Sequence, residues 1–321
     1  MDIRQIFINP AGRLRSGWRL AVFIILYVAI FFVLASGVRI FYAIALRAAP
    51  GVNLGSLGGF LSNIVFRVIL LAPALIAGFI CTRALEGLPW RALGISPHAG
   101  WLRDLVVGAF VGILSLALAT AIATGGGGLS FTFNARTAVI PVIKTLITSA
   151  VLFLIAALAE EALFRGYPLQ TFARARLTLF GVLLTSLGFV VIHLQNPNIS
   201  EGIPYLNLLL AGIWLAVAYL HTRSLWFPLG IHWGWNWALG SLFGLPVSGI
   251  DTLAPHPVLR GADLGPAWLT GGSFGIEGGV ACTVALIIST VIVWRLPLVG
   301  PTVEMTVLTS QENPVVKPSE S

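Results

Sequence analysis

The stretch AVLFLIAALAEEALFR, residues 150–165, joins ten apolar residues to two adjacent glutamates and an arginine. An apolar run without turn residues or charges predicts a helix that is buried in protein or in lipid. Ionisable residues at the end of such a run are costly to remove from water and are candidates for function. The stretch therefore predicts a membrane helix that carries Glu160, Glu161 and Arg165.

The composition of the whole chain also indicates a membrane environment. Of its 321 residues, 57% are hydrophobic and 10% are charged, whereas a soluble domain carries about 25% charged residues. The net charge of +7 does not indicate nucleic-acid binding, because the basic residues lie between hydrophobic segments and not in one patch. Cys81 and Cys282 lie in or near apolar segments without a CxxC partner, so neither a disulfide framework nor a zinc knuckle is expected.

Eight segments approach the roughly 20 apolar residues that a helix needs to cross a bilayer. The sequence therefore predicts an all-α, polytopic transmembrane bundle of about eight helices over residues 18–296. A cytoplasmic segment, residues 1–17, precedes it, and a polar tail, residues 297–321, is expected to be disordered. The expected spans are Trp18–Phe41, Phe60–Ala84, Asp104–Ala123, Ala138–Phe164, Leu177–Leu194, Tyr205–His221, Leu225–Phe243 and Glu277–Leu296.

Basic residues are denser in the N-terminal segment and in alternate loops than in the remaining loops. Because cytoplasmic loops carry an excess of Lys and Arg, both termini are predicted to lie in the cytoplasm. The short loops are compatible with a protein of the bacterial cytoplasmic membrane. Arg67 lies inside the second segment, and the simplest interpretation is that its side chain extends toward the outer headgroups. No role is assigned to the Pro-rich loop 245–275.

Helical geometry separates the two glutamates. Residues four positions apart share a helix face, so Glu161 is expected to pair with Arg165. Glu160 is turned by about 100° from Glu161, which leaves its carboxylate free for chemistry. A structural ion pair at a helix end is an alternative interpretation of Glu161 and Arg165, and it is compatible with catalysis.

Two further segments place polar side chains in the same interior. Phe189 and His193 share a face of the fifth segment. His232 and Asn236 share a face of the seventh. A single membrane histidine is often only a hydrogen-bond donor between helices. Polar side chains on three segments of a chain so poor in charge indicate a common site instead.

This set of side chains suits the hydrolysis of an amide bond. A glutamate removed from water can act as general base, and His193 could hold the same water. His232 and Asn236 could donate hydrogen bonds to the developing oxyanion. Alternatively, Glu160, His193 and His232 match the His₂Glu ligand set of a catalytic zinc site, assembled from separate helices because the HExxH motif is absent.

Three motifs, in this order on successive segments, resemble those of a known family. EEALFR (160–165) resembles EExxxR, FVVIH (189–193) resembles FxxxH, and HWGWN (232–236) resembles HxxxN. They are similar to the CPBP family of CAAX proteases and bacteriocin-processing enzymes, which includes the type II CAAX prenyl endopeptidases. The motif core spans residues 151–240.

The resemblance implies an all-helical fold whose site opens toward the cytoplasm and which cleaves a membrane-associated substrate. The lipid bilayer and a membrane-associated peptide or protein, prenylated CAAX-type substrates included, are then the expected partners. The family is often described as metalloproteases, with zinc as cofactor, but a metal-free, glutamate-based mechanism is also held for it. By resemblance, Glu160 and His193 position and activate water, His232 and Asn236 stabilise the oxyanion, and Glu161 and Arg165 support them.

Two other classes of function are weighed against an intramembrane endopeptidase. A non-catalytic partner or regulator of another membrane protein, of the bacteriocin-immunity kind, could use the same helices without chemistry. A transporter or channel is disfavoured, because the polar residues cluster at one depth and no repeated pair of broken helices is visible. The substrate, the metal and the oligomeric state are left open.

Overall fold

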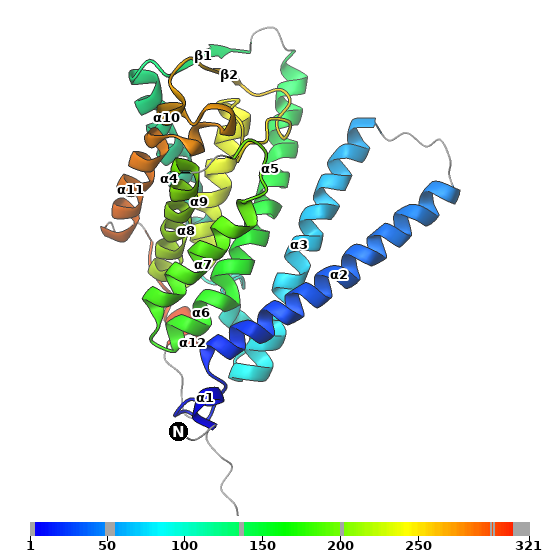
Figure 1. The fold of residues 1–321 in the computed structure, drawn as a ribbon, viewed down its shortest axis with the longest axis vertical. Coiled ribbons are helices and arrows are strands. Elements are labelled where there is room, and N and C mark those ends of the chain that lie inside the picture. Colours follow the sequence, from blue (N-terminus) through cyan, green and yellow to red (C-terminus); the bar gives the residue numbers. More distant parts are fainter. Residues whose placement is uncertain are drawn as a thin grey trace, which may run out of the picture.

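Long helices dominate the computed structural model, which describes residues 4–48, 55–134, 138–199, 202–295, 297 and 299–310 (Figure 1). The long helices are α2 (Ser16–Ala48), α3 (Gly55–Glu86), α4 (Trp101–Gly125), α5 (Val139–Glu161), α7 (Thr178–His193), α8 (Ile203–Thr222), α9 (Trp226–Trp237) and α11 (Val280–Arg295). The short ones are α1 (Arg4–Phe7), α6 (Tyr167–Arg174), α10 (Ala267–Thr270) and α12 (Val303–Thr309). Single 3₁₀ turns lie at Trp90–Leu93, Gly272–Phe274 and Ile276–Gly278, and π-helical turns at Ala162–Gly166 and Ala238–Leu242.

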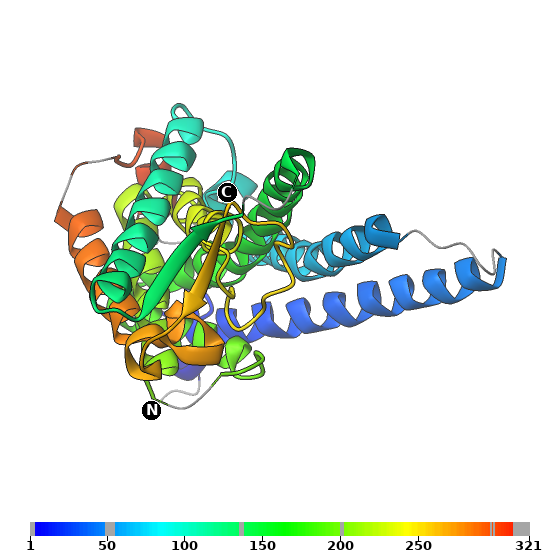
Figure 2. The ribbon, with the colours of Figure 1, turned by 90° about the horizontal axis from the view of Figure 1, so that it is seen from above.

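Six of the long helices, α4, α5, α7, α8, α9 and α11, form a bundle, while α2 and α3 lean away from it (Figures 1 and 2). The main apolar core lies between α4, α8, α9 and α11 and includes Leu116, Trp214, Ile231 and Leu286. By contrast, α2 is strongly apolar but only 6% buried within the chain. An exposed apolar surface of this size is stable only in lipid, and the protein is an integral membrane protein.

The closest helix packing in the bundle is between α4 and α9. Gly108 and Gly112 on α4 face Gly230 and Gly234 on α9, and each helix repeats a glycine after four residues. A Cβ atom added at Gly112 would lie 2.1 Å from the Ile231 carbonyl oxygen, and one at Gly234 would lie 2.3 Å from that of Ala109. Small residues at this spacing let two helix backbones touch, and the pair was not recognised from the sequence.

Buried charges fasten α2 and α3 to the bundle at one end. Arg19 on α2 lies 3.1 Å from the Glu86 carboxylate at the end of α3. Thr171 on α6 donates to the same oxygen at 2.5 Å, and Arg174 on α6 forms a second ion pair with Glu86. These contacts fix the N-terminal pair of helices beside α6, while their other ends diverge from the bundle (Figure 1).

A two-stranded antiparallel sheet covers the opposite end, where only Gly-rich and Pro-rich loops were expected. Strand β1 (Leu129–Phe133) pairs with β2 (Leu259–Asp263), with Leu129 opposite Asp263. Gly127 has a φ of 73°, in the left-handed region that glycine tolerates, so the chain turns sharply from α4 into β1. The fold is all-α apart from this hairpin-like cap.

Five helical segments are long and apolar enough to cross a membrane: Ser16–Ala48, Leu57–Glu86, Trp101–Gly125, Val139–Arg174 and Ile203–Thr222. They coincide with the first, second, third, fourth and sixth expected spans. The fifth and eighth correspond to α7 and α11, of 16 residues each, and the seventh to α9 with the π-helical turn after it. A polytopic helical bundle is confirmed, whereas the number eight stays a prediction.

Three boundaries differ from those expected. The fourth segment does not end at Phe164 but continues to Arg174 with a bend, because Pro168 lacks the N–H that would bond to the Phe164 carbonyl. The eighth helix begins at Val280, so Glu277 lies in the preceding turn. Within the expected polar tail, α12 is ordered, because Thr302 caps it and Met305 is buried. Residues 311–321 lie outside the described residues.

The α4–α9 contact yields a stability prediction. We expect Gly112→Ala or Gly234→Ala to lower the free energy of unfolding by about 1–3 kcal/mol, because each methyl group would push apart two backbones in contact. Thermal unfolding in detergent measures the loss. The matched control is Gly37→Ala on α2, where an added Cβ meets nothing within 4 Å. Equal melting temperatures for all three variants would contradict the packing argument.

Candidate active site

Glu161 and Arg165 form a fully buried ion pair beside the end of α5. Arg165 Nη1 lies 3.0 Å from Glu161 Oε1, and both side chains are 0% exposed. Arg165 Nη2 donates to the Gly212 carbonyl oxygen on α8 at 2.9 Å. The π-helical turn Ala162–Gly166 carries Arg165, and such turns occur often at functional sites. The expected pairing is therefore present, and it also joins α5 to α8.

The second partner of Glu161 is His232 on α9. The ring atom Nδ1 of His232 lies 2.9 Å from Glu161 Oε1. Because a carboxylate only accepts hydrogen bonds, Nδ1 is the donor in this contact. The other ring nitrogen, Nε2, is thereby left to face Glu160. Glu161 thus orients a histidine that lies 71 positions away in the sequence.

His193 is oriented in the same manner from α7. Its Nδ1 lies 2.7 Å from the Phe189 carbonyl oxygen, so Nδ1 carries the proton and Nε2 faces outward. The Phe189 ring contacts His193 with a centroid separation of 4.5 Å and lies 5.1 Å from the guanidinium carbon of Arg165. The first residue of the FVVIH motif therefore holds the histidine through its carbonyl group and its ring.

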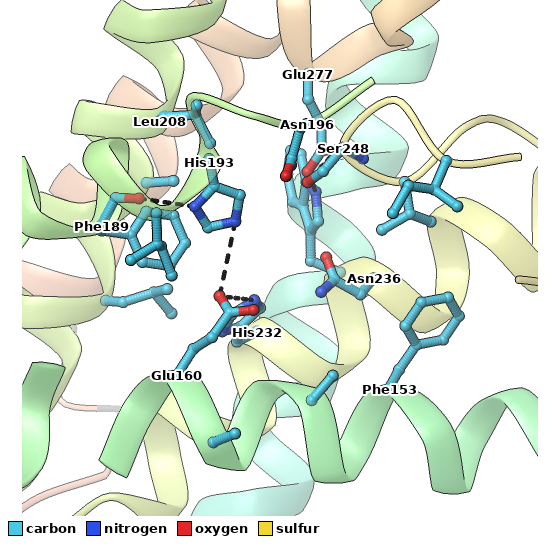
Figure 3. Close-up of a pocket in the computed structure, with 18 of the residues that line it drawn as sticks. Phe153, Glu160, Phe189, His193, Asn196, Leu208, His232, Asn236, Ser248 and Glu277 are labelled. Atoms are coloured by element: carbon cyan, nitrogen blue, oxygen red, sulfur yellow. Dashed lines mark hydrogen bonds and ion pairs between the residues drawn. The ribbon is translucent and has the colours of Figure 1, made fainter. Parts of the chain in front are cut away.

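Glu160 faces both histidines. Its Oε2 lies 3.8 Å from Nε2 of His193 and 3.8 Å from Nε2 of His232 (Figure 3). The Glu160 side chain is 20% exposed, whereas that of Glu161 is 0% exposed. The two adjacent glutamates therefore differ: Glu161 is consumed by structural contacts, and Glu160 borders open space. The three atoms surround a position that a water molecule could occupy.

Asn236 projects into the same cavity, one helical turn after His232 (Figure 3). Tryptophans on another face of α9 hold the helix to α5. Trp233 Nε1 donates to the Ala150 carbonyl oxygen at 2.9 Å, and Trp237 Nε1 donates to that of Leu146 at 3.0 Å. With its glycines against α4 and its tryptophans against α5, α9 has little freedom to rotate its polar face away from Glu160.

The cavity has a volume of about 420 Å³. It is lined by Glu160, His193, His232 and Asn236 and by mostly apolar side chains of α2, α3, α5, α8 and α9. Two charged residues that no site was assigned to from the sequence also line it, Arg67 and Glu277. Glu277 accepts hydrogen bonds from Trp235 at 2.9 Å and from the Ser248 backbone at 2.6 Å. Their signal in the sequence was a lone charge within or beside an apolar segment.

The depth of His193 follows from the chain between the two helices. Glu160 lies 14 residues before Arg174, and His193 lies 15 residues after Thr178. At 1.5 Å per residue both lie about 21–22 Å along the helix from the turn that joins α6 to α7. The continuous helix α7 corrects the expectation that the fifth segment is broken near Gly188 or shifted. Glu160 is not at the helix end, because α6 continues beyond it.

The donor types of a His₂Glu zinc site are present. Nδ1 of each histidine bonds to an oxygen atom, which is the usual arrangement behind a metal-ligating imidazole. As the side chains are placed, however, no group of three His, Cys, Asp or Glu residues in the described part of the chain is close enough to hold a metal ion. Zinc ligation by Glu160, His193 and His232 stays a prediction.

Two comparisons with known proteins bear on this arrangement. Residues 141–238 match the family model described as type II CAAX prenyl endopeptidase Rce1-like. The matched range contains all three motifs. The chain is also similar to an Escherichia coli protein described as an uncharacterized 24.3 kDa protein, with 33% identity over 156 residues, which cover 46% of this chain and 69% of that protein.

The buried ion pair separates the two glutamates in a stability measurement. We expect Glu161→Gln to lower the free energy of unfolding by about 3–5 kcal/mol, because Arg165 then stays buried without a counter-charge. Glu160→Gln, the matched control, should change the melting temperature little. The double variant Glu161→Gln, Arg165→Met should recover stability, because it leaves no unpaired charge. Equal melting temperatures for the two single variants would refute the distinction.

Proposed function

Because the chain belongs to the family of Rce1-like type II CAAX prenyl endopeptidases, we propose that it is an intramembrane endopeptidase that hydrolyses a peptide bond of a membrane-associated substrate. The observation that carries the proposal is the convergence of Glu160, His193 and His232, with separations of 3.8 Å, at the wall of a cavity within the bundle. A site that is removed from bulk water can still admit and position a single water molecule.

Glu160 is the proposed general base. A water between its Oε2 and the Nε2 atom of His193 gives a proton to the carboxylate and attacks the scissile carbonyl carbon. His193 keeps this water in place, because its Nδ1 proton is held by the Phe189 carbonyl group. Glu160 then delivers the proton to the leaving amine, so that proton uptake and release balance over the cycle.

His232 and Asn236 are the proposed oxyanion donors. His232 in its doubly protonated form donates from Nδ1 to Glu161 and from Nε2 to the developing oxyanion. The amide group of Asn236 donates from the same face of α9. Glu161 and Arg165 do not touch the substrate in this scheme and act by orienting His232.

The proposed substrate is a lipid-embedded peptide or protein, and prenylated CAAX-type chains fall within this class. Cytoplasmic placement of both ends of the chain and a bacterial cytoplasmic membrane complete the proposal. The contact of Arg91 with Glu304, at 2.6 Å, supports it, because it brings α12 to the same end of the bundle as α1 and Glu86. The density of basic residues favours the cytoplasm for this end.

Glu160→Gln is the direct test of the endopeptidase. In proteoliposomes with lipidated peptides, we expect this variant to lose about 10²–10⁴-fold in cleavage rate, since the amide cannot accept the proton. Glu304→Gln is the matched control, because this carboxylate lies at the surface, paired with Arg91. Cleavage retained by Glu160→Gln would overturn the mechanism. A non-catalytic regulator would keep its cellular function in the same variant.

Metal dependence calls for its own measurement. If Glu160, His193 and His232 hold zinc, the active protein should contain one zinc per chain, and a chelator should remove metal and activity together. The ion would polarise the scissile carbonyl group and activate water. Elemental analysis beside the cleavage assay decides between the two mechanisms. Full activity in metal-free protein would select the glutamate-based one.

A further inference from the structure

Arg67 is a charged residue in the middle of an apolar helix. It lies 12 residues after the start of α3 and 19 residues before Glu86, within a segment apolar enough to span a membrane. An arginine at such a position is costly, and it usually faces a bundle interior or a wet cavity. Here it lines the cavity that contains Glu160 and His193. This differs from the expectation that it extends to the outer headgroups.

The charge of Arg67 is not compensated within the described residues. Its guanidinium carbon lies 5.5 Å from the centre of the Phe66 ring, and its buried Nε has no hydrogen-bond partner. The two acids of the cavity have other contacts, Glu160 with the histidines and Glu277 with Trp235 and Ser248. An arginine without a partner in an apolar environment is stabilised when an anion binds to it.

The geometry of a guanidinium defines the ligand. Its parallel N–H groups match a planar or tetrahedral oxyanion, such as a carboxylate or a phosphate. The other residues that α2 and α3 contribute to the cavity are Tyr27, Phe66 and Leu70, so the surroundings of Arg67 favour an apolar chain that ends in one anionic group. A cavity of about 420 Å³ admits a few residues of extended peptide, not a folded domain.

We propose that Arg67 binds the free α-carboxylate at the C-terminus of the substrate, and so restricts cleavage to bonds a few residues from that end. The inference rests on the proposed peptidase function and makes Arg67 a specificity-determining residue. The attraction between the two charges is stronger in a cavity of low polarity than in water. A substrate whose C-terminus is amidated would leave the guanidinium without a counter-charge.

The test compares one short, apolar, lipidated peptide in two forms, the free acid and the C-terminal amide. In proteoliposomes of phosphatidylcholine, wild-type protein should cleave the acid about 10- to 100-fold more efficiently than the amide, with the difference mainly in KM. Arg67→Gln should cleave both forms with the efficiency that wild type shows for the amide. Arg67→Lys should keep part of the preference, because the charge remains without the bidentate fork.

Two controls keep the result interpretable. Arg39→Gln, on the exposed surface of α2, should leave the ratio of acid to amide cleavage unchanged. Unchanged cleavage of the amide by Arg67→Gln shows in the same preparation that this variant is folded. A ratio that is the same in Arg67→Gln and wild type would overturn the proposal.

A lipid phosphate is the other source of an oxyanion, and vesicle composition distinguishes it. If Arg67→Gln changes activity only when phosphatidylglycerol is added, and equally for acid and amide, Arg67 binds lipid and the proposal fails. Binding of the two peptides to Glu160→Gln protein separates this inference from the peptidase function. Selective binding of the acid that Arg67→Gln removes supports the role of Arg67 even where no peptide is cleaved.

Discussion

The carboxylate of Glu161 is the contact on which the site depends. It is fully buried and accepts hydrogen bonds from Arg165 and from His232. Arg165 also donates to the Gly212 carbonyl group, so that one ion cluster joins α5, α8 and α9. A buried charge is tolerated only where it is paired and hydrogen-bonded. The cluster therefore holds the three helices in the one arrangement that satisfies every member.

The remaining helix contacts allow this arrangement to form. Glycines bring α4 and α9 into backbone contact, and two tryptophan N–H groups bond to carbonyl oxygens of α5. Both helices that supply Glu160 and Asn236 pass into a π-helical turn soon after these residues. The wider turn changes the direction in which the following side chains point. The bundle thus combines rigid packing outside the cavity with irregular helix geometry at its wall.

The cavity combines two kinds of charge that are held in different ways. Glu160 faces two histidines whose opposite ring nitrogens are already bound, so its surroundings are ordered before any substrate enters. Arg67 stands on α3, which leans away from the bundle and is fastened to it at the Glu86 end (Figure 1). Preorganised groups favour the chemical step, whereas a cation without a partner favours the capture of an anionic group.

The sequence by itself determined what depends on neighbours along the chain. Apolar length identified the helices, and the spacing of four residues predicted the pairing of Glu161 with Arg165, because both lie on one helix. The bend after Phe164 and the ordered α12 were not expected, since each depends on contacts with other elements. Only the tertiary structure decided that His232 reaches Glu161 and that Arg67 enters the cavity. These contacts join residues distant in the sequence, and helix packing sets them, to which the periodicity of a single segment is blind.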